Sequence, residues 1–71
     1  MSVFIKRMAF KSSIVKKGWN AKQLADHVPM DYVYLNKIIN SKANPSDLMA
    51  IKISNALEVD VSEVFEIKEK V

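Results

Sequence analysis

Cysteine is absent from this 71-residue chain, and glycine and histidine each occur only once. Without thiols the chain forms no disulfide, so its stability must come from packing, and a reducing cytoplasm is the expected location. A single imidazole without cysteine does not furnish a zinc site, and a single glycine does not make a phosphate-binding loop. We therefore expect no metal, no cofactor and no enzymatic activity.

Proline is nearly as scarce, with two residues, whereas 49% of the chain is hydrophobic. Such a composition favours a compact, helix-rich fold with short connections. One domain is expected, because a chain of this length holds a single small core that buries roughly 60% of its unfolded surface. The longest apolar run is too short to cross a bilayer and the start shows no signal-peptide pattern, so a soluble intracellular protein is predicted.

Acidic residues are scarce in the first part of the chain. Residues 1–42 contain eight Lys or Arg and two acids, a net charge of +6, whereas residues 43–71 contain three Lys and six acids, a net charge of −3. The basic half favours an anionic partner, most simply nucleic acid. The alternative is a solvated basic surface without a partner.

Apolar spacing is helical over most of the chain and predicts five short helices. The first is expected at residues 2–17, with Ser2 as its cap and Gly18 as its stop. Its apolar side chains fall into two groups, of which a core needs one, so the other is available to a later helix or to another subunit. One group is Phe4, Ile5, Met8, Ala9 and Val15, and the other is Val3, Phe10 and Ile14.

A capping-box pattern marks the start of the second helix. Asn20 and Gln23 stand three residues apart and predict a helix at residues 21–27, which Pro29 ends. Its inward-facing residues are expected to be Leu24, Ala25 and Val28. The third helix is predicted at about residues 32–40, with Asp31 as its cap. Its expected core residues are Leu35 and Ile38.

Asn44 as cap and Pro45 in the first turn predict a fourth helix that ends near Leu57. Its apolar positions include Leu48, Ile51, Ala56 and Leu57. Asp60 and Glu63 repeat the capping-box spacing and predict a short fifth helix. The closing segment FEIKEKV alternates apolar Phe65, Ile67 and Val71 with charged residues, which is typical either of an edge strand or of a frayed end.

A set of short motifs lies in register, without a gap, over residues 19–65, WNAKQLADHVPMDYVYLNKIINSKANPSDLMAIKISNALEVDVSEVF. The motifs are Leu24-Ala25, Leu35 with Ile38, Asn44-Pro45-Ser46, Ile51-Lys52-Ile53 with Ala56-Leu57, and Val59 to Phe65. Together they resemble the Cro/CI-like (Xre-type) helix-turn-helix family.

The resemblance implies an all-α, compact five-helix lambda-repressor-like DNA-binding domain over residues 1–71. The helix-turn-helix would occupy about residues 20–40, and residues 66–71 would form an extended tail. It also implies a transcriptional repressor that binds a double-stranded DNA operator, as a homodimer, in the cytoplasm of a bacterial or phage-infected host cell.

Site residues follow from the resemblance position by position. The base-reading residues would be Tyr32, Val33, Asn36 and Lys37. The residues that contact DNA phosphates would be Lys16, Lys17, Asn20, Lys22, Tyr34 and Lys42. His27, at a helix end, is expected to face solvent.

The chain departs from the family pattern at the turn and on the predicted reading helix. Pro29 stands where the family usually has a turn glycine, so the turn is expected to be rebuilt. Ala21 replaces a glutamine that often binds phosphate, and the charge of Asp31 lies where phosphate would approach. Exposed tyrosine and aliphatic residues are typical of protein interfaces, so a modulator or antirepressor that docks onto a partner repressor is the alternative function. Its interface would be Tyr32, Val33, Tyr34 and Ile39.

Overall fold

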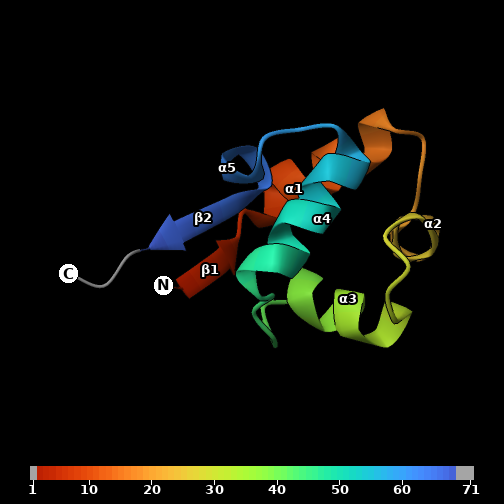
Figure 1. Cartoon of the computed structure of the whole chain (residues 1–71). Helices are drawn as coiled ribbons and strands as arrows, with labels where there is room; N and C mark the ends of the chain where they lie inside the picture. Colours follow the sequence, from red (N-terminus) through yellow and green to blue (C-terminus); the bar gives the residue numbers. More distant parts are fainter. Residues whose placement is uncertain (1, 69–71) are drawn as a thin grey trace.

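The computed structural model describes residues 2–68, which form five helices and two short strands (Figure 1). In chain order the elements are β1 (Ser2–Ile5), α1 (Arg7–Lys16), α2 (Ala21–His27), α3 (Tyr32–Ile39), α4 (Asp47–Leu57), α5 (Val61–Val64) and β2 (Phe65–Lys68). The five predicted helices are therefore present, and four of them have bounds close to the expected ones.

The first element differs from the prediction, because residues 2–5 form strand β1 and not the first turn of a helix. It pairs antiparallel with β2, placing Val3 opposite Ile67 and Ile5 opposite Phe65. The domain is thus mostly helical but not all-α, and the closing segment takes the strand alternative over residues 65–68. Val71, the last residue of the predicted alternation, lies outside the described residues.

The sheet joins the two ends of the described chain, and hydrogen bonding between these ends extends one pair beyond the strands. The Lys6 N–H donates to the Val64 carbonyl at 2.8 Å, directly beside the last pair of the ladder. Phe65 is fully buried and meets Phe10 of α1 edge-on, with ring centroids 5.7 Å apart. Pairing two terminal segments therefore places one aromatic residue from each end of the chain in the same core.

The buried residues of the first segment come from one of the two predicted apolar groups, and from the other group only Ile5 packs against the core. Phe10 and Ile14 are buried, as is Val3 from the strand, whereas Met8 and Val15 are 86% and 73% exposed. The remaining core comes from all the other helices, and its fully buried apolar residues are Leu24, Leu35, Ile38, Ile53 and Val64.

The caps of the later helices differ from the prediction. Helix α4 begins after Ser46, whose hydroxyl accepts from the Met49 N–H at 3.2 Å, so Asn44 is not its cap. Leu48 and Ile51 lie on its exposed side, at 62% and 47% exposure. Helix α5 has no side-chain capping bond at Asp60, whose carboxylate accepts from the nearby Ser62 hydroxyl at 2.8 Å.

Helices α1 to α4 all end in the same backbone motif, in which a residue with positive φ reverses the chain. These residues are Gly18 (φ +74°), Pro29 (φ +23°), Ser41 (φ +60°) and Glu58 (φ +59°). In each case the next N–H returns to a carbonyl five residues earlier, at 2.8 to 3.1 Å. Glycine adopts a positive φ freely, but only one of these four residues is a glycine.

Candidate nucleic-acid interface

Helices α2 and α3 form a helix-turn-helix whose two helices are set by local hydrogen bonds. The predicted capping box at the start of α2 is confirmed: the Gln23 N–H donates to Asn20 Oδ1 at 2.8 Å, and the Asn20 N–H donates to Gln23 Oε1 at 2.9 Å. Asp31 caps α3, where its Oδ1 accepts from the Val33 N–H at 3.4 Å. Ala25, 2% exposed, lies on the buried side of α2, where its small side chain permits close packing.

The turn between the two helices has a positive φ at Pro29, the position where the family usually has glycine. The Met30 N–H closes the motif by donating to the Ala25 carbonyl at 3.0 Å. Proline has no N–H, so the second bond of this motif, to the Asp26 carbonyl, cannot form. The turn therefore shares the positive φ and the closing bond, here from Met30 to Ala25, with the other helix ends, but it has one hydrogen bond fewer, and its φ lies far from the value of about −65° that the proline ring prefers.

Helix α3 presents one face to the core and the opposite face to solvent. Leu35, Ile38 and Ile39 are buried and share one side, because their spacing of three and four residues repeats with the helix. The four candidate base-reading residues, Tyr32, Val33, Asn36 and Lys37, are all exposed. Figure 1 shows α3 along the lower edge of the molecule, with α4 above it in the middle of the view and the sheet at another edge.

Two residues of the alternative protein interface are not free on the surface. Ile39 is 6% exposed and belongs to the core, so its expected exposure is wrong. Tyr34 is half-buried, and its hydroxyl donates to the Asn44 carbonyl at 3.4 Å. Tyr32 and Val33, at 43% and 58% exposure, are what remains of that apolar surface.

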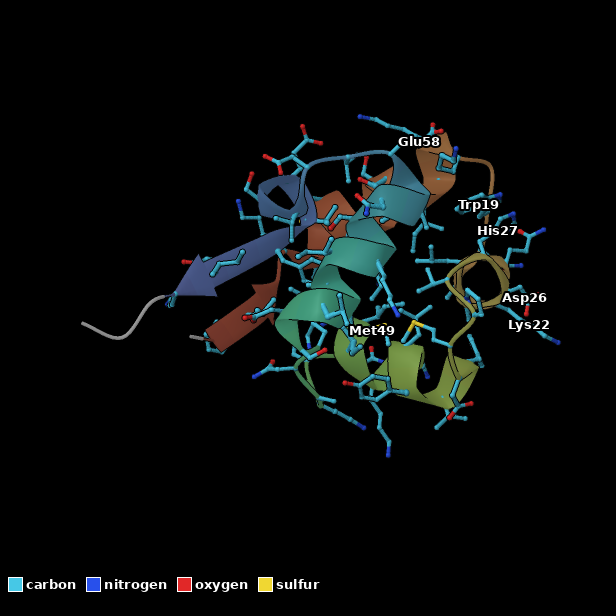
Figure 2. All side chains as sticks on the ribbon, viewed as in Figure 1. Trp19, Lys22, Asp26, His27, Met49 and Glu58 are labelled. Carbon is cyan, nitrogen blue, oxygen red and sulfur yellow. The ribbon has the colours of Figure 1, made fainter. Side chains whose placement is uncertain are left out.

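The candidate phosphate-contacting residues occupy three different environments. Lys16, Lys22 and Lys42 are exposed, and Figure 2 shows Lys22 projecting from α2 into solvent. The Asn20 side chain is occupied by the capping box. Lys17 lies at the far end of α1, where its Nζ is 3.1 Å from a Glu58 carboxylate oxygen and 5.0 Å from the centre of the Trp19 ring.

His27 is exposed as expected but has a defined position. Its ring stacks on Trp19 with centroids 4.0 Å apart, and its Nδ1 lies 2.9 Å from the Gln23 carbonyl oxygen. Figure 2 shows the two rings side by side at the outer side of α2. This contact connects the end of α2 to the segment that precedes it.

Helix α1 contributes to the surface beside α3, which the sequence did not reveal. Arg7 Nη2 donates to Asn40 Oδ1 at 2.9 Å, across 33 residues of sequence. A groove of about 440 Å³ runs between α1, the start of α2 and α3. Its polar lining includes Lys11, Asn20, Asn36 and Asn40. The only sequence signal was the four-residue spacing of Arg7 and Lys11, which places both on one side of a helix but does not say what lies opposite.

Comparison with known families identifies the class of protein. A helix-turn-helix family model matches residues 11–64, which is most of the chain and includes α2 and α3. The chain belongs to the Xre-type (Cro/CI-like) helix-turn-helix family, a family of DNA-binding regulatory domains. No curated protein matches it, and no solved structure does. Strands β1 and β2 both lie outside the matched residues.

Within residues 2–68, no helix has the length and apolar character needed to cross a membrane. The same part of the chain contains no group of three or more His, Asp or Glu side chains placed to hold a metal ion.

Proposed function

We propose that this protein is a transcriptional regulator of the repressor type, which binds a duplex operator by placing α3 in the major groove. The observation that supports this most directly is the division of α3 into a fully packed side and a side on which Tyr32, Val33, Asn36 and Lys37 are all exposed. A helix supported in this way enters a groove about 12 Å wide without losing its core contacts.

The exposed face of α3 offers chemistry suited to base edges. Asn36 and Lys37 supply hydrogen-bond donors, and each good bidentate base contact contributes about 1 to 3 kcal/mol of discrimination. Tyr32 and Val33 supply apolar surface for thymine methyl groups. These contacts select a sequence, whereas contacts to the sugar-phosphate backbone fix the position of the helix.

Exposed lysines on the elements next to α3 in the chain supply the sequence-independent part of the affinity. Lys22 on α2 and Lys42 directly after α3 are exposed, and Lys16 adds to the charge of α1. Asn20 and Tyr34 contribute polar groups, while Lys17 acts as a weaker contact because Glu58 balances its charge. A lambda-repressor-like two-fold dimer would place two α3 helices on half-sites about 34 Å apart.

Salt dependence tests DNA binding. Binding to duplex DNA, measured by fluorescence anisotropy over a series of salt concentrations, should weaken with a log–log slope of about 0.9 per neutralised phosphate. Lys22→Ala and Lys42→Ala should each reduce the slope by roughly one unit and leave sequence preference unchanged. Lys68→Ala, on the terminal sheet, is the charge-matched control. An affinity independent of salt, or no affinity for any duplex, would contradict the proposal.

A second candidate function rests on Tyr32 and Val33, which expose adjacent apolar side chains at the start of α3. Such a surface also suits docking onto a partner repressor, as in a phage modulator or antirepressor. Val33→Lys separates the two functions, because a buried unpaired charge would abolish a protein interface, whereas the added positive charge would preserve or strengthen the salt-dependent affinity for any duplex even where the contact of Val33 with a base is lost. The measurement is capture of a partner protein from the native host by the wild type and by the variant, alongside the DNA titration.

A further inference from the structure

Three side chains on the outer surface of α1 and α3 form a hydrogen-bonded chain that ends at a candidate base-reading residue. Arg7 Nη2 donates to Asn40 Oδ1 at 2.9 Å. Asn40 Nδ2 then donates to the Asn36 carbonyl oxygen at 3.0 Å and to Asn36 Oδ1 at 3.2 Å. Asn36 and Asn40 are one helical turn apart, so the contact fits the helix geometry.

The chemistry of these groups allows only one orientation of the two amides. A guanidinium group only donates hydrogen bonds, so Asn40 must turn its oxygen toward Arg7 and its NH₂ group toward Asn36. The Asn36 backbone carbonyl only accepts, which agrees with this orientation. Because the Asn40 NH₂ group also donates to the Asn36 side chain, Asn36 must turn its own oxygen toward Asn40, and its NH₂ group faces away from Asn40.

We propose that Arg7 and Asn40 are positioning residues that orient Asn36 so that it offers donors to DNA, which makes Asn36 select guanine and not adenine. Adenine in the major groove requires an amide to accept from N6 and donate to N7 at once. Asn36 Oδ1 is held toward Asn40, whereas its Nδ2 donates to no protein group within residues 2–68. Guanine presents two neighbouring acceptors, O6 and N7, which fit an outward-facing NH₂ group.

Lys37 strengthens the same preference, since an ammonium group also offers donors only. The side chains of Asn36 and Lys37, which are adjacent on α3, therefore both offer donors to base edges that present acceptors. This inference rests on the proposed function, because it assigns a base to a helix proposed to enter DNA. The chain of hydrogen bonds itself is testable without DNA.

In the free protein, side-chain NH₂ resonances of Asn36 and Asn40 report the chain of hydrogen bonds. Arg7→Met should shift both pairs of resonances, because removing the donor frees Asn40 to rotate and Asn36 with it. Arg7→Lys retains a donor and should keep them near their wild-type positions. Lys68→Met removes the same charge from the terminal sheet and should leave them unchanged. If the Asn36 and Asn40 resonances have the same chemical shifts in Arg7→Met as in the wild type, the inference is overturned.

Selection from a library of randomised duplexes tests the base preference. The base pair read by Asn36 is the one whose preference disappears in Asn36→Ala. At that position the wild type should favour guanine over adenine by about fivefold or more. The Arg7→Met and Asn40→Ala variants should lose this preference for guanine and accept adenine as well, because an amide that is free to rotate can contact adenine bidentately. The Arg7→Lys variant should retain the preference for guanine.

The outcomes distinguish the inference from the function on which it rests. Adenine selected by the wild type, or the same base selected by the wild type and Arg7→Met, would overturn the orientation of Asn36 while leaving operator binding in place. If no duplex is bound by any variant, including the wild type, the proposed function fails and the base assignment fails with it, even where the resonances confirm the hydrogen-bonded chain.

Discussion

The helix-turn-helix and the terminal sheet are built by opposite means. Helices α2 and α3 are specified by contacts a few residues apart, such as the capping box of Asn20 and Gln23. The sheet pairs Val3 with Ile67, at opposite ends of the chain. The family match includes the first region and excludes both strands. The helices that carry the proposed recognition surface are thus specified by local contacts. The pairing of β1 with β2, which joins distant residues, adds Val3 and Phe65 to the core.

The two regions also differ in how their residues divide between the core and the surface. Asn36 and Lys37 on α3 expose polar groups and take no part in the core. In the sheet, Phe65 is fully buried, while Phe4 and Ile67 remain 40% and 41% exposed, and Lys68 lies over the Phe4 ring at 5.5 Å. We infer that substitutions on the outer face of α3 affect binding without stability, and that substitutions at the inner residues of the sheet affect stability first.

The largest effect is expected from Phe65→Ala. Removing a fully buried aromatic ring that contacts Phe10 should lower the free energy of unfolding by about 3 to 5 kcal/mol. Urea denaturation followed by circular dichroism measures it. Glu66→Ala, the exposed neighbour, is the control and should change the stability by less than about 0.5 kcal/mol. A stable Phe65→Ala domain would mean that the sheet is dispensable and would remove the contrast between the regions.

Lys37→Ala tests the other side of the comparison. It should weaken binding to the selected operator by about 1 to 3 kcal/mol, if Lys37 contacts a base, and change the free energy of unfolding by less than about 0.5 kcal/mol. Paired titration and denaturation of the same preparation separate the two quantities. A loss of stability as large as the loss of binding would show that the exposed face of α3 also supports the fold.

Pro29→Gly sharpens the description of the turn. Glycine accepts a positive φ and restores the N–H that can donate to the Asp26 carbonyl, so the domain should gain about 1 kcal/mol or more in stability. Gly18→Ala is the matched reverse change at φ +74°, where an added Cβ meets nothing within 4 Å among the described residues. It should lose about 1 to 2 kcal/mol through backbone strain alone. Thermal unfolding of both variants checks the pair, and a destabilised Pro29→Gly would be the contrary result.

The smallest effect is expected at the ion pair between α1 and Glu58. Lys17 and Glu58 side chains are 28% and 76% exposed, so water screens the pair. Lys17→Met should cost less than about 1 kcal/mol in low salt, and the cost should shrink in high salt. Denaturation at two ionic strengths measures this. A cost that does not change with salt would contradict the assignment to a screened ion pair.

Much of the helix-turn-helix was predictable because its signals are local. The bounds of α2 agree with its capping box, and Leu24, Ala25, Leu35 and Ile38 are buried as their spacing indicated. The first segment was not predictable, because SVFI fits helical spacing as well as a strand and its partner lies some sixty residues further along the chain. A strand of four residues has no sequence signal for its partner.

The sequence alone determined the family, the number of helices, the caps of α2 and α3 and the concentration of positive charge in the first 42 residues, because these depend on neighbouring residues or on composition. Tertiary structure decided that Ile39 is buried and Val33 is exposed, although both are β-branched residues on one helix. It also decided that Arg7 reaches Asn40. The physical reason is that burial and long-range hydrogen bonds depend on which helices cross, and that arrangement is set by the packing of the whole core.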